Sequence, residues 1–162
     1  YTHPRGHLKM RSVKLYMDGA LGSRGAALFA DYSDAPGQRG LLVTPAERIE
    51  AAAVRARDCG VQVATHAIGD RGNRLVLDIY QRVLADADSN HRWRVEHAQI
   101  VKQADIPRFT AMQVIASMQP THATSDMPWA EARVGLARIV GGYAWRQFRD
   151  AGARLALGSD FP

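Results

Sequence analysis

Four side chains that can bind a metal ion lie in or directly after short apolar segments of this sequence. They are Lys14, His66, His97 and Asp160. Neutral imidazole and carboxylate groups are usual ligands of zinc and similar divalent ions. A buried lysine can lose its proton, and its neutral amine can then react with carbon dioxide to give a carbamate that bridges two metal ions. The set therefore predicts a site for one or two divalent ions, with zinc as the expected metal.

Each of the four residues also has a simpler explanation when it is taken alone. A single histidine at the end of a strand is more often a hydrogen-bonded structural residue than a ligand. A lysine in a strand usually extends its charged end into water, and Asp160, which follows a Gly-Ser pair, fits a turn. Four such residues in equivalent places favour a shared cause, and a metal centre provides one.

Strands and helices alternate along the chain and would bring these residues together. Apolar segments predict strands at residues 12–18, 61–65, 93–97, 114–118 and 154–158. Helical spacing of apolar residues predicts helices at residues 45–58, 71–87, 103–111, 130–140 and 143–151, and residues 119–129 predict a long polar loop. This order predicts an α/β fold with parallel strands joined by right-handed crossovers. The carboxyl ends of such strands meet at one face, where an α/β barrel holds its active site.

The start of the first helix carries a specific signal. In Thr44-Pro-Ala-Glu47, the threonine is expected at the N-cap, the proline at the first helical position, and the glutamate reaching back to the cap. This capping box predicts a helix that begins at Pro45.

The composition excludes several classes of protein. Hydrophobic residues make up 46% and charged residues 23% of the 162 residues, so the chain is globular and of a length that suits one domain. No apolar run approaches the roughly 20 residues of a membrane span, and the single cysteine, Cys59, excludes an internal disulfide framework. The net charge is +5, but the arginines are spread along the chain rather than gathered in a stripe. We therefore expect neither a nucleic-acid nor a membrane partner, and the compartment stays open, with the cytoplasm favoured.

Five motifs along the chain carry a resemblance to a known family. They are Val13-Lys-Leu-Tyr-Met-Asp-Gly-Ala-Leu-Gly-Ser-Arg-Gly-Ala26, His66-Ala-Ile-Gly-Asp70, Glu96-His-Ala-Gln99, Gln119-Pro-Thr-His-Ala-Thr-Ser-Asp-Met-Pro-Trp129 and Gly158-Ser-Asp-Phe-Pro162. In this order they resemble the amidohydrolase-3 family of the amidohydrolase superfamily, a group of metal-dependent hydrolases that includes YtcJ-like proteins and N-substituted formamide deformylase. The resemblance implies a partial TIM (β/α)₈ barrel. This chain would be its C-terminal portion, strands four to eight, without strands one to three.

The resemblance also implies a role for each residue at the strand ends. Lys14 would be a bridging ligand in its carbamylated form, and His66 and His97 would bind the metal directly. Asp160 would bind metal and carry the proton during catalysis. The implied reaction is hydrolysis of carbon–nitrogen bonds other than peptide bonds, in small amide or formamide-type substrates, by a metal-activated hydroxide.

Several further residues have alternatives that the sequence leaves open. Arg24 is a candidate to hold a substrate carboxylate, or else a solvated loop residue. His122 is a candidate to line the mouth of the same site and contact substrate, or else has no ligand. Glu96 and Asp70 are candidates to orient His97 and His66, with surface roles equally plausible.

The chain departs from the family pattern in one respect. Such families carry a His-x-His pair on strand one, and this sequence contains none. We therefore expect this chain alone to be weakly active or inactive, and a non-catalytic half-barrel that acts as an assembly or interaction module is the alternative. Five strands cannot close a barrel, so two open edges could join copies of the chain into a homo-oligomer.

Overall fold

Five parallel strands form the centre of the molecule. The computed structural model describes residues 2, 5–85 and 90–161. The strands are β1 (Ser12–Tyr16), β2 (Gln62–Ala67), β3 (Arg94–His97), β4 (Ile115–Met118) and β5 (Leu155–Leu157). They pair in chain order, and every pair is parallel. The predicted α/β fold with five parallel strands and crossover helices is therefore confirmed.

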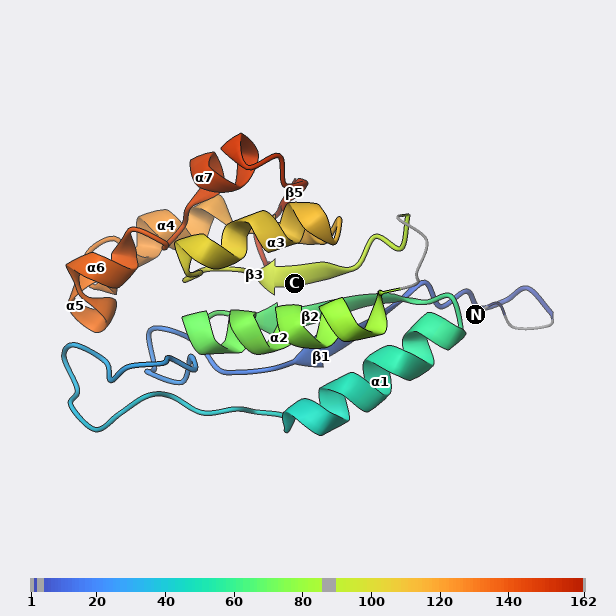
Figure 1. Ribbon diagram of the computed structural model, residues 1–162, viewed down its shortest axis with the longest axis horizontal. Coiled ribbons are helices and arrows are strands. Elements are labelled where there is room, and N and C mark those ends of the chain that lie inside the picture. Colours follow the sequence, from blue (N-terminus) through green and yellow to red (C-terminus); the bar gives the residue numbers. More distant parts are fainter. Residues whose placement is uncertain (1, 3–4, 86–89, 162) are drawn as a thin grey trace.

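Helices cover one face of this sheet and gather at one end of it. The first three are α1 (Ala46–Asp58), α2 (Asp70–Val83) and α3 (Ile106–Ala111), the last preceded by a short 3₁₀ turn, η1 (Gln103–Asp105). They lie side by side in front of the strands in Figure 1. The shorter helices are α4 (Pro120–Asp126), α5 (Ala130–Val134), α6 (Leu136–Ile139) and α7 (Trp145–Asp150). Of these, α4, α5 and α6 lie at the left of Figure 1, beside the loop that follows β1.

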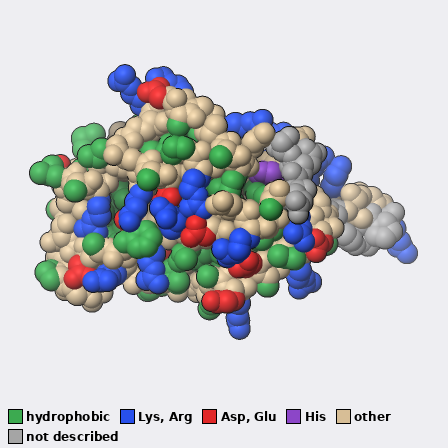
Figure 2. All heavy atoms as spheres, in the orientation of Figure 1, with side chains coloured by type: hydrophobic (Ala, Val, Ile, Leu, Met, Phe, Trp, Pro, Cys, Tyr) green, Lys and Arg blue, Asp and Glu red, His purple; other side chains and the backbone are tan. Residues whose placement is uncertain are grey.

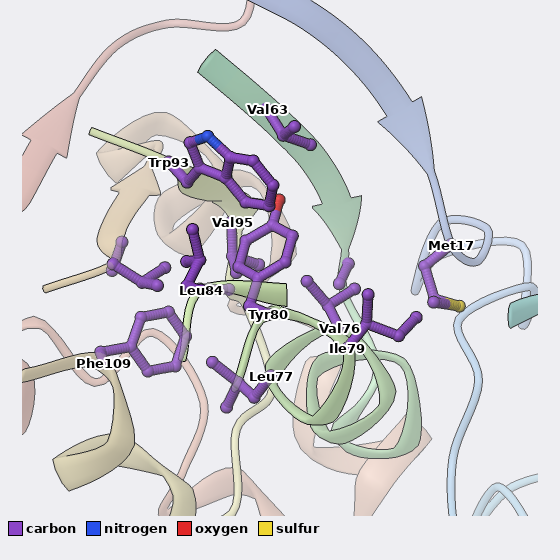
Figure 3. Close-up of a cluster of buried hydrophobic side chains, with 14 of the residues drawn as sticks. Met17, Val63, Val76, Leu77, Ile79, Tyr80, Leu84, Trp93, Val95 and Phe109 are labelled. Atoms are coloured by element: carbon purple, nitrogen blue, oxygen red, sulfur yellow. The ribbon is translucent and has the colours of Figure 1, made fainter. Parts of the chain in front are cut away.

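The main hydrophobic core fills the space between the sheet and α2. Val63 of β2 and Val95 of β3 point towards α2, which contributes Val76 and Tyr80 (Figure 3). The Tyr80 ring packs edge to face against Trp93, with ring centroids 5.0 Å apart. Burying one large apolar side chain in such a core stabilises the fold by about 2 kcal/mol. This packing fixes β2 and β3, and with them the histidines near the ends of these strands.

The outer faces of the helices are charged. In Figure 2, Lys and Arg side chains lie among Asp and Glu side chains over this face. Arg82 of α2 pairs with Glu50 of α1 at 2.8 Å, and Arg74 of α2 pairs with Asp105 of η1 at 2.7 Å. Arg82 is exposed to water, so its pair with Glu50 contributes at most about 1 kcal/mol. The Asp105 carboxylate is buried, so its pair with Arg74 is not a surface ion pair of this kind. Both pairs join neighbouring helical segments.

The capping box predicted at the start of α1 is wrong. The helix begins at Ala46, so Pro45 takes the N-cap position, and no side chain caps the helix. Pro45 has an extended ψ of 141°, and its carbonyl accepts hydrogen bonds from the N–H groups of Arg48 and Ile49. Proline has no side-chain oxygen, so the exchange of hydrogen bonds that defines a capping box cannot form at this position.

The predicted loop at residues 119–129 is also wrong, because most of it forms α4. Pro120 is the first helical residue, a position that suits its fixed φ. Inside the helix, the hydroxyl of Thr124 donates to the carbonyl of Thr121, and the hydroxyl of Ser125 donates to the carbonyl of His122. These local hydrogen bonds satisfy the polar side chains that made the segment resemble a loop.

Two predicted helices differ in extent. α2 begins at Asp70 and ends at Val83, and the end predicted at Ala87 lies outside the described residues. The helix predicted at residues 130–140 is divided into α5 and α6 at Gly135. Gly135 has a φ of +76°, a left-handed conformation that interrupts helical hydrogen bonding and that glycine adopts without strain.

The face of the sheet opposite the helices is open at β1. Ser12, Lys14 and Tyr16 are exposed, whereas Val13 and Leu15 between them are half-buried against the core. This alternation follows from the two-residue repeat of a strand. Within residues 2, 5–85 and 90–161, no helix combines the length and apolar character that crossing a membrane requires.

Candidate metal centre

A cavity of about 520 Å³ opens at the carboxyl ends of the strands. Its lining includes all four residues proposed from the sequence as metal ligands, namely Lys14, His66, His97 and Asp160. His122, the predicted substrate contact, also lines it. The structure therefore brings these five residues to one cavity, while their roles as ligands and substrate contact stay predictions.

The register of the sheet places the two histidines on neighbouring strands, one residue out of step. His66 is level with Glu96 in the neighbouring strand, and Ala67 is level with His97. His97 therefore lies one step further along the strand direction, and the two rings meet edge to face with centroids 4.6 Å apart. Separations of this order allow two imidazoles to reach one ion.

His97 has an unusual backbone conformation at the end of β3. Its φ is +74°, and that of the next residue, Ala98, is +43°. A non-glycine residue in this region is strained, and such strain persists only where the surrounding structure holds it. His97 is 6% exposed, and its Nδ1 lies 2.8 Å from Oε1 of Gln119. The amide oxygen can only accept, so Nδ1 carries the proton and Nε2 keeps a lone pair.

His66 is held from the side of β1. Its Nε2 lies 3.5 Å from the carbonyl oxygen of Gly19 and 3.6 Å from Oδ1 of Asp18. Both neighbours are acceptors, so they favour a proton on Nε2 and leave the lone pair on Nδ1. Each histidine thus has one ring nitrogen directed at an acceptor of the protein and one that remains available.

Lys14 and Asp160 are more exposed to solvent than the histidine pair. The Nζ of Lys14 lies 5.2 Å from the centroid of the Tyr16 ring, on the exposed side of β1. Asp160 is half exposed, and its Oδ2 lies 4.0 Å from Nε2 of His122. Asp160 also has a positive φ, +61°, which turns its side chain at the end of β5. Two imidazoles are therefore close together, and the lysine and the carboxylate lie at the rim.

The buried carboxylate of Asp18 organises the loops around this cavity. Its Oδ2 accepts hydrogen bonds from the N–H groups of Ala27 (2.8 Å) and Gly69 (2.9 Å), and its Oδ1 accepts from Ile68 (2.9 Å). Burial raises the pKa of Asp18 to about 6, although these backbone hydrogen bonds act in the opposite direction. A Cβ on Gly72 would overlap Oδ2, so glycine is required for α2 to approach so closely.

Comparison with known proteins identifies the chain. Residues 1–162 match the model of the Amidohydrolase family. The chain belongs to this family. The match confirms the resemblance that the five sequence motifs indicated.

Relatives in the amidohydrolase family match only over part of their own length. The chain is 38% identical over 157 residues to the Protein LONG AFTER FAR-RED 3 of Arabidopsis thaliana. This match covers 96% of this chain and 27% of that protein. It is 29% identical over 114 residues to N-substituted formamide deformylase of Arthrobacter pascens. This second match covers 68% of this chain and 20% of that enzyme. The chain thus spans less than a third of these relatives.

A solved structure shows the same arrangement of strands and helices. It is that of an uncharacterized metal-dependent hydrolase from Pyrococcus horikoshii, with a TM-score of 0.84 and 34% sequence identity. The match covers 94% of this chain and 30% of the other. The likeness assigns the five strands of this amidohydrolase-family chain to the barrel fold of such enzymes.

The donor set fits a divalent ion in part. Burial, together with the charge of the neighbouring His97, lowers the pKa of His66 to about 4, and burial also lowers the pKa of His97. Both imidazoles are therefore neutral at pH 7, the form that binds metal. In the part of the chain that the structure describes, however, no three His, Cys, Asp or Glu side chains are grouped closely enough to hold an ion. The histidine pair therefore supplies two of the ligands that such an ion needs.

Other predicted site residues have partners elsewhere. Arg24 does not line the cavity; its guanidinium forms a bidentate pair with Asp34, at 2.9 and 3.1 Å. Asp70 accepts a hydrogen bond from the N–H of Phe29, and Glu96 pairs with the guanidinium two residues before it. Among the described residues, no hydrogen bond joins Asp70 or Glu96 to His66 or His97, and both side chains are buried rather than on the surface. Gln119 contacts His97, and Asp18 and Gly19 contact His66.

Sequence reasoning missed a second polar group on the cavity wall. Nε2 of Gln99 donates to Oδ2 of Asp126 (2.8 Å) and lies 2.6 Å from the hydroxyl of Tyr143, which itself donates to Asp126 (2.7 Å). Gln99 and Asp126 both line the cavity. They fall inside two of the recognised motifs, but side chains 27 residues apart give no local signal of their contact.

The lowered pKa of His66 predicts a pH dependence of stability in the metal-free protein. Its pKa of about 4 in the folded protein lies below the ordinary histidine pKa of 6.5, so between these values the unfolded chain binds a proton that the folded chain does not. Stability from His66 is therefore complete above pH 6.5 and falls as the pH drops towards 4, by up to about 3 kcal/mol. The free energies of unfolding of the protein and of a His66→Asn variant, measured with urea, should converge as the pH falls. A difference that stays constant from pH 7 to 4.5 would contradict this account.

Proposed function

We propose that the chain forms part of a metal-dependent hydrolase that cleaves carbon–nitrogen bonds other than peptide bonds. The observation that carries the proposal is the pair of neutral histidines, each with one ring nitrogen directed at a protein acceptor, in a member of the amidohydrolase family. The substrate class is supported by the relative that acts as an N-substituted formamide deformylase. A bound divalent ion, most simply zinc, would supply a Lewis acid for the carbonyl oxygen and lower the pKa of water.

The residues of this chain would act on the substrate from one side of the cavity. His66 and His97 would hold the ion, while Lys14 would complete its ligands after conversion to a carbamate. Asp160 would accept a proton from the attacking water and return it to the leaving nitrogen, so that the carbon gains an oxygen and the amine leaves neutral. The half-exposed position of Asp160 leaves its carboxylate free to approach the reacting atoms.

The cavity also suits a small amide. Leu21, Ile68 and Trp129 form apolar parts of its wall, and His122 lies between His97 and Asp160. The ring of His122 stacks on that of His97 with centroids 5.7 Å apart, so one ring nitrogen points towards Asp160. His122 could thereby contact the substrate close to the carboxylate that moves the proton.

A second candidate function is a non-catalytic half-barrel that serves as an assembly module. The observation that favours it is the lack, among the described residues, of any group of three ligands. The sequence also contains no His-x-His pair. This alternative requires no hydrolysis and no bound metal.

Amine release from small amides separates the two candidates. The protein is incubated with zinc and an N-substituted formamide or a simple amide, and the amine is measured with and without a chelator. We expect slow release that the chelator abolishes and that an Asp160→Asn variant lowers about 10²–10⁴-fold, the usual contribution of a positioned acid–base group. Asp150→Asn, an exposed aspartate on α7, is the matched control. Release that survives both chelation and Asp160→Asn contradicts the proposal, and absence of zinc-dependent release favours the assembly module.

A further inference from the structure

Gln119 forms a polar side-chain contact with the ring of His97. Oε1 of Gln119 lies 2.8 Å from Nδ1 of His97, a normal hydrogen-bond distance. Both residues are buried, at 7% and 6% exposure. In the low dielectric of the protein interior, this hydrogen bond is stronger than one in water. Losing it leaves a buried polar atom without a partner.

The amide of Gln119 is oriented by a second contact. Its Nε2 lies 3.3 Å from the carbonyl oxygen of Ser117, to which it donates. If the amide were turned over, its oxygen would face this carbonyl, and two acceptors would repel each other. The carbonyl of Ser117 therefore directs Oε1 of Gln119, an acceptor, towards His97.

The backbone holds Gln119 in place for this contact. Gln119 follows β4 directly and is the N-cap residue of α4, with φ −119° and ψ 106°. Pro120 favours such an extended conformation in the residue before it. The carbonyl of Gln119 also accepts the N–H of His122, which ties it to the first turn of α4. The strand end and the helix start thus fix where the amide lies.

We propose that Gln119 is a positioning residue that keeps His97 in the tautomer with its proton on Nδ1. This inference rests on the proposed function, in which His97 binds the metal. A neutral imidazole in water prefers to carry its proton on Nε2, and that proton would block the nitrogen that the contact with Gln119 leaves free. By accepting a hydrogen bond only from Nδ1–H, Gln119 reverses this preference and leaves the lone pair of Nε2 free. The same bond restrains a residue whose backbone is strained.

Three variants test this role. Gln119→Leu removes the acceptor at similar side-chain volume, and Gln119→Glu restores an acceptor at the same distance from the backbone. Gln99→Leu removes a second buried glutamine, which lines the cavity, is 4% exposed and bonds to Asp126 and Tyr143. It is a matched control for the loss of a buried amide.

The first measurement is the tautomer of His97 in the metal-free protein, from nitrogen NMR of histidine-labelled samples, with the signal assigned by a His97→Gln variant. We expect the proton on Nδ1 in the wild type, in Gln119→Glu and in Gln99→Leu, and a shift towards Nε2 in Gln119→Leu. The second is zinc affinity, by competition with a fluorescent chelator. We expect zinc to bind about 10–100-fold more weakly to Gln119→Leu, the usual effect of removing a residue that orients a metal-binding side chain. In Gln119→Glu we expect the zinc affinity to recover in part.

The two measurements keep this proposal distinct from the proposed function. If the tautomer changes in Gln119→Leu but the wild type binds no zinc, the positioning role stands and the metal site fails. If the tautomer is the same in wild type and Gln119→Leu, the positioning role is wrong, whatever the zinc affinity. Equal tautomer shifts in Gln119→Leu and Gln99→Leu would also overturn it, because the effect would then follow from general loss of packing.

Discussion

Replacing Asp18 with alanine should lower the free energy of unfolding by about 3 kcal/mol or more, because three buried N–H groups lose their acceptor. These belong to Ala27, Ile68 and Gly69, and Asp18 itself is 1% exposed. Water cannot replace the carboxylate without opening the loops. A loss of this size is a large part of the roughly 5–15 kcal/mol that stabilises a typical domain.

Urea unfolding measures this effect, and amide hydrogen exchange locates it. We expect exchange to accelerate first at Ala27, Ile68 and Gly69. Asp18→Asn should lose less stability, since its amide oxygen can still accept. Asp150→Ala, which removes an exposed aspartate paired only with arginines, should change stability by less than about 0.5 kcal/mol. An Asp18→Ala variant as stable as Asp150→Ala would contradict the role assigned to Asp18.

The strands could be predicted because their signal is local. Apolar residues run through β2 and β3 as in buried parallel strands, those of β1 alternate with exposed residues, and the alternation with helices predicts the order of the sheet. That topology places His66 and His97 at the ends of neighbouring strands. The contact of their rings also involves the left-handed backbone of His97, which the sequence does not reveal.

The partners of the histidines could not be predicted, because they depend on contacts between distant segments. Gln119 is 22 residues from His97, and Gly19 is 47 residues from His66. Asp70 and Glu96 were closer in sequence to the histidines and carried the right charge, yet each pairs elsewhere. Residues that are close in sequence need not be in contact, because successive side chains of a strand point to opposite faces of the sheet.

The predicted helix boundaries were wrong where a single residue could either continue the helix or end it. Pro45 suits either the N-cap or the first helical turn, and the structure selects the N-cap. Gly135 divides a segment whose apolar residues continue at helical spacing on both sides. The polar residues of α4 resembled a loop because their hydrogen bonds to the preceding turn are invisible in the sequence.

The largest expected effect on binding is loss of the metal when both histidines are removed. The two imidazoles lie with their rings 4.6 Å apart and are neutral at pH 7, so they would supply most of the binding energy. A carboxylate at the rim cannot hold zinc alone against water. A His7→Ala/His91→Gln variant is the control, because it removes two histidines that do not line the cavity.

The most direct test of the metal centre is the zinc content of the purified, tag-free protein after dialysis, measured by plasma emission beside a His66→Ala/His97→Ala variant. We expect about one zinc per chain in the wild type and in the His7→Ala/His91→Gln control, and none in the His66→Ala/His97→Ala variant. Equal zinc in the wild type and the His66→Ala/His97→Ala variant would contradict it, since the metal would then lie elsewhere. Absence of zinc from the wild type as well would show that these residues alone do not form a metal centre.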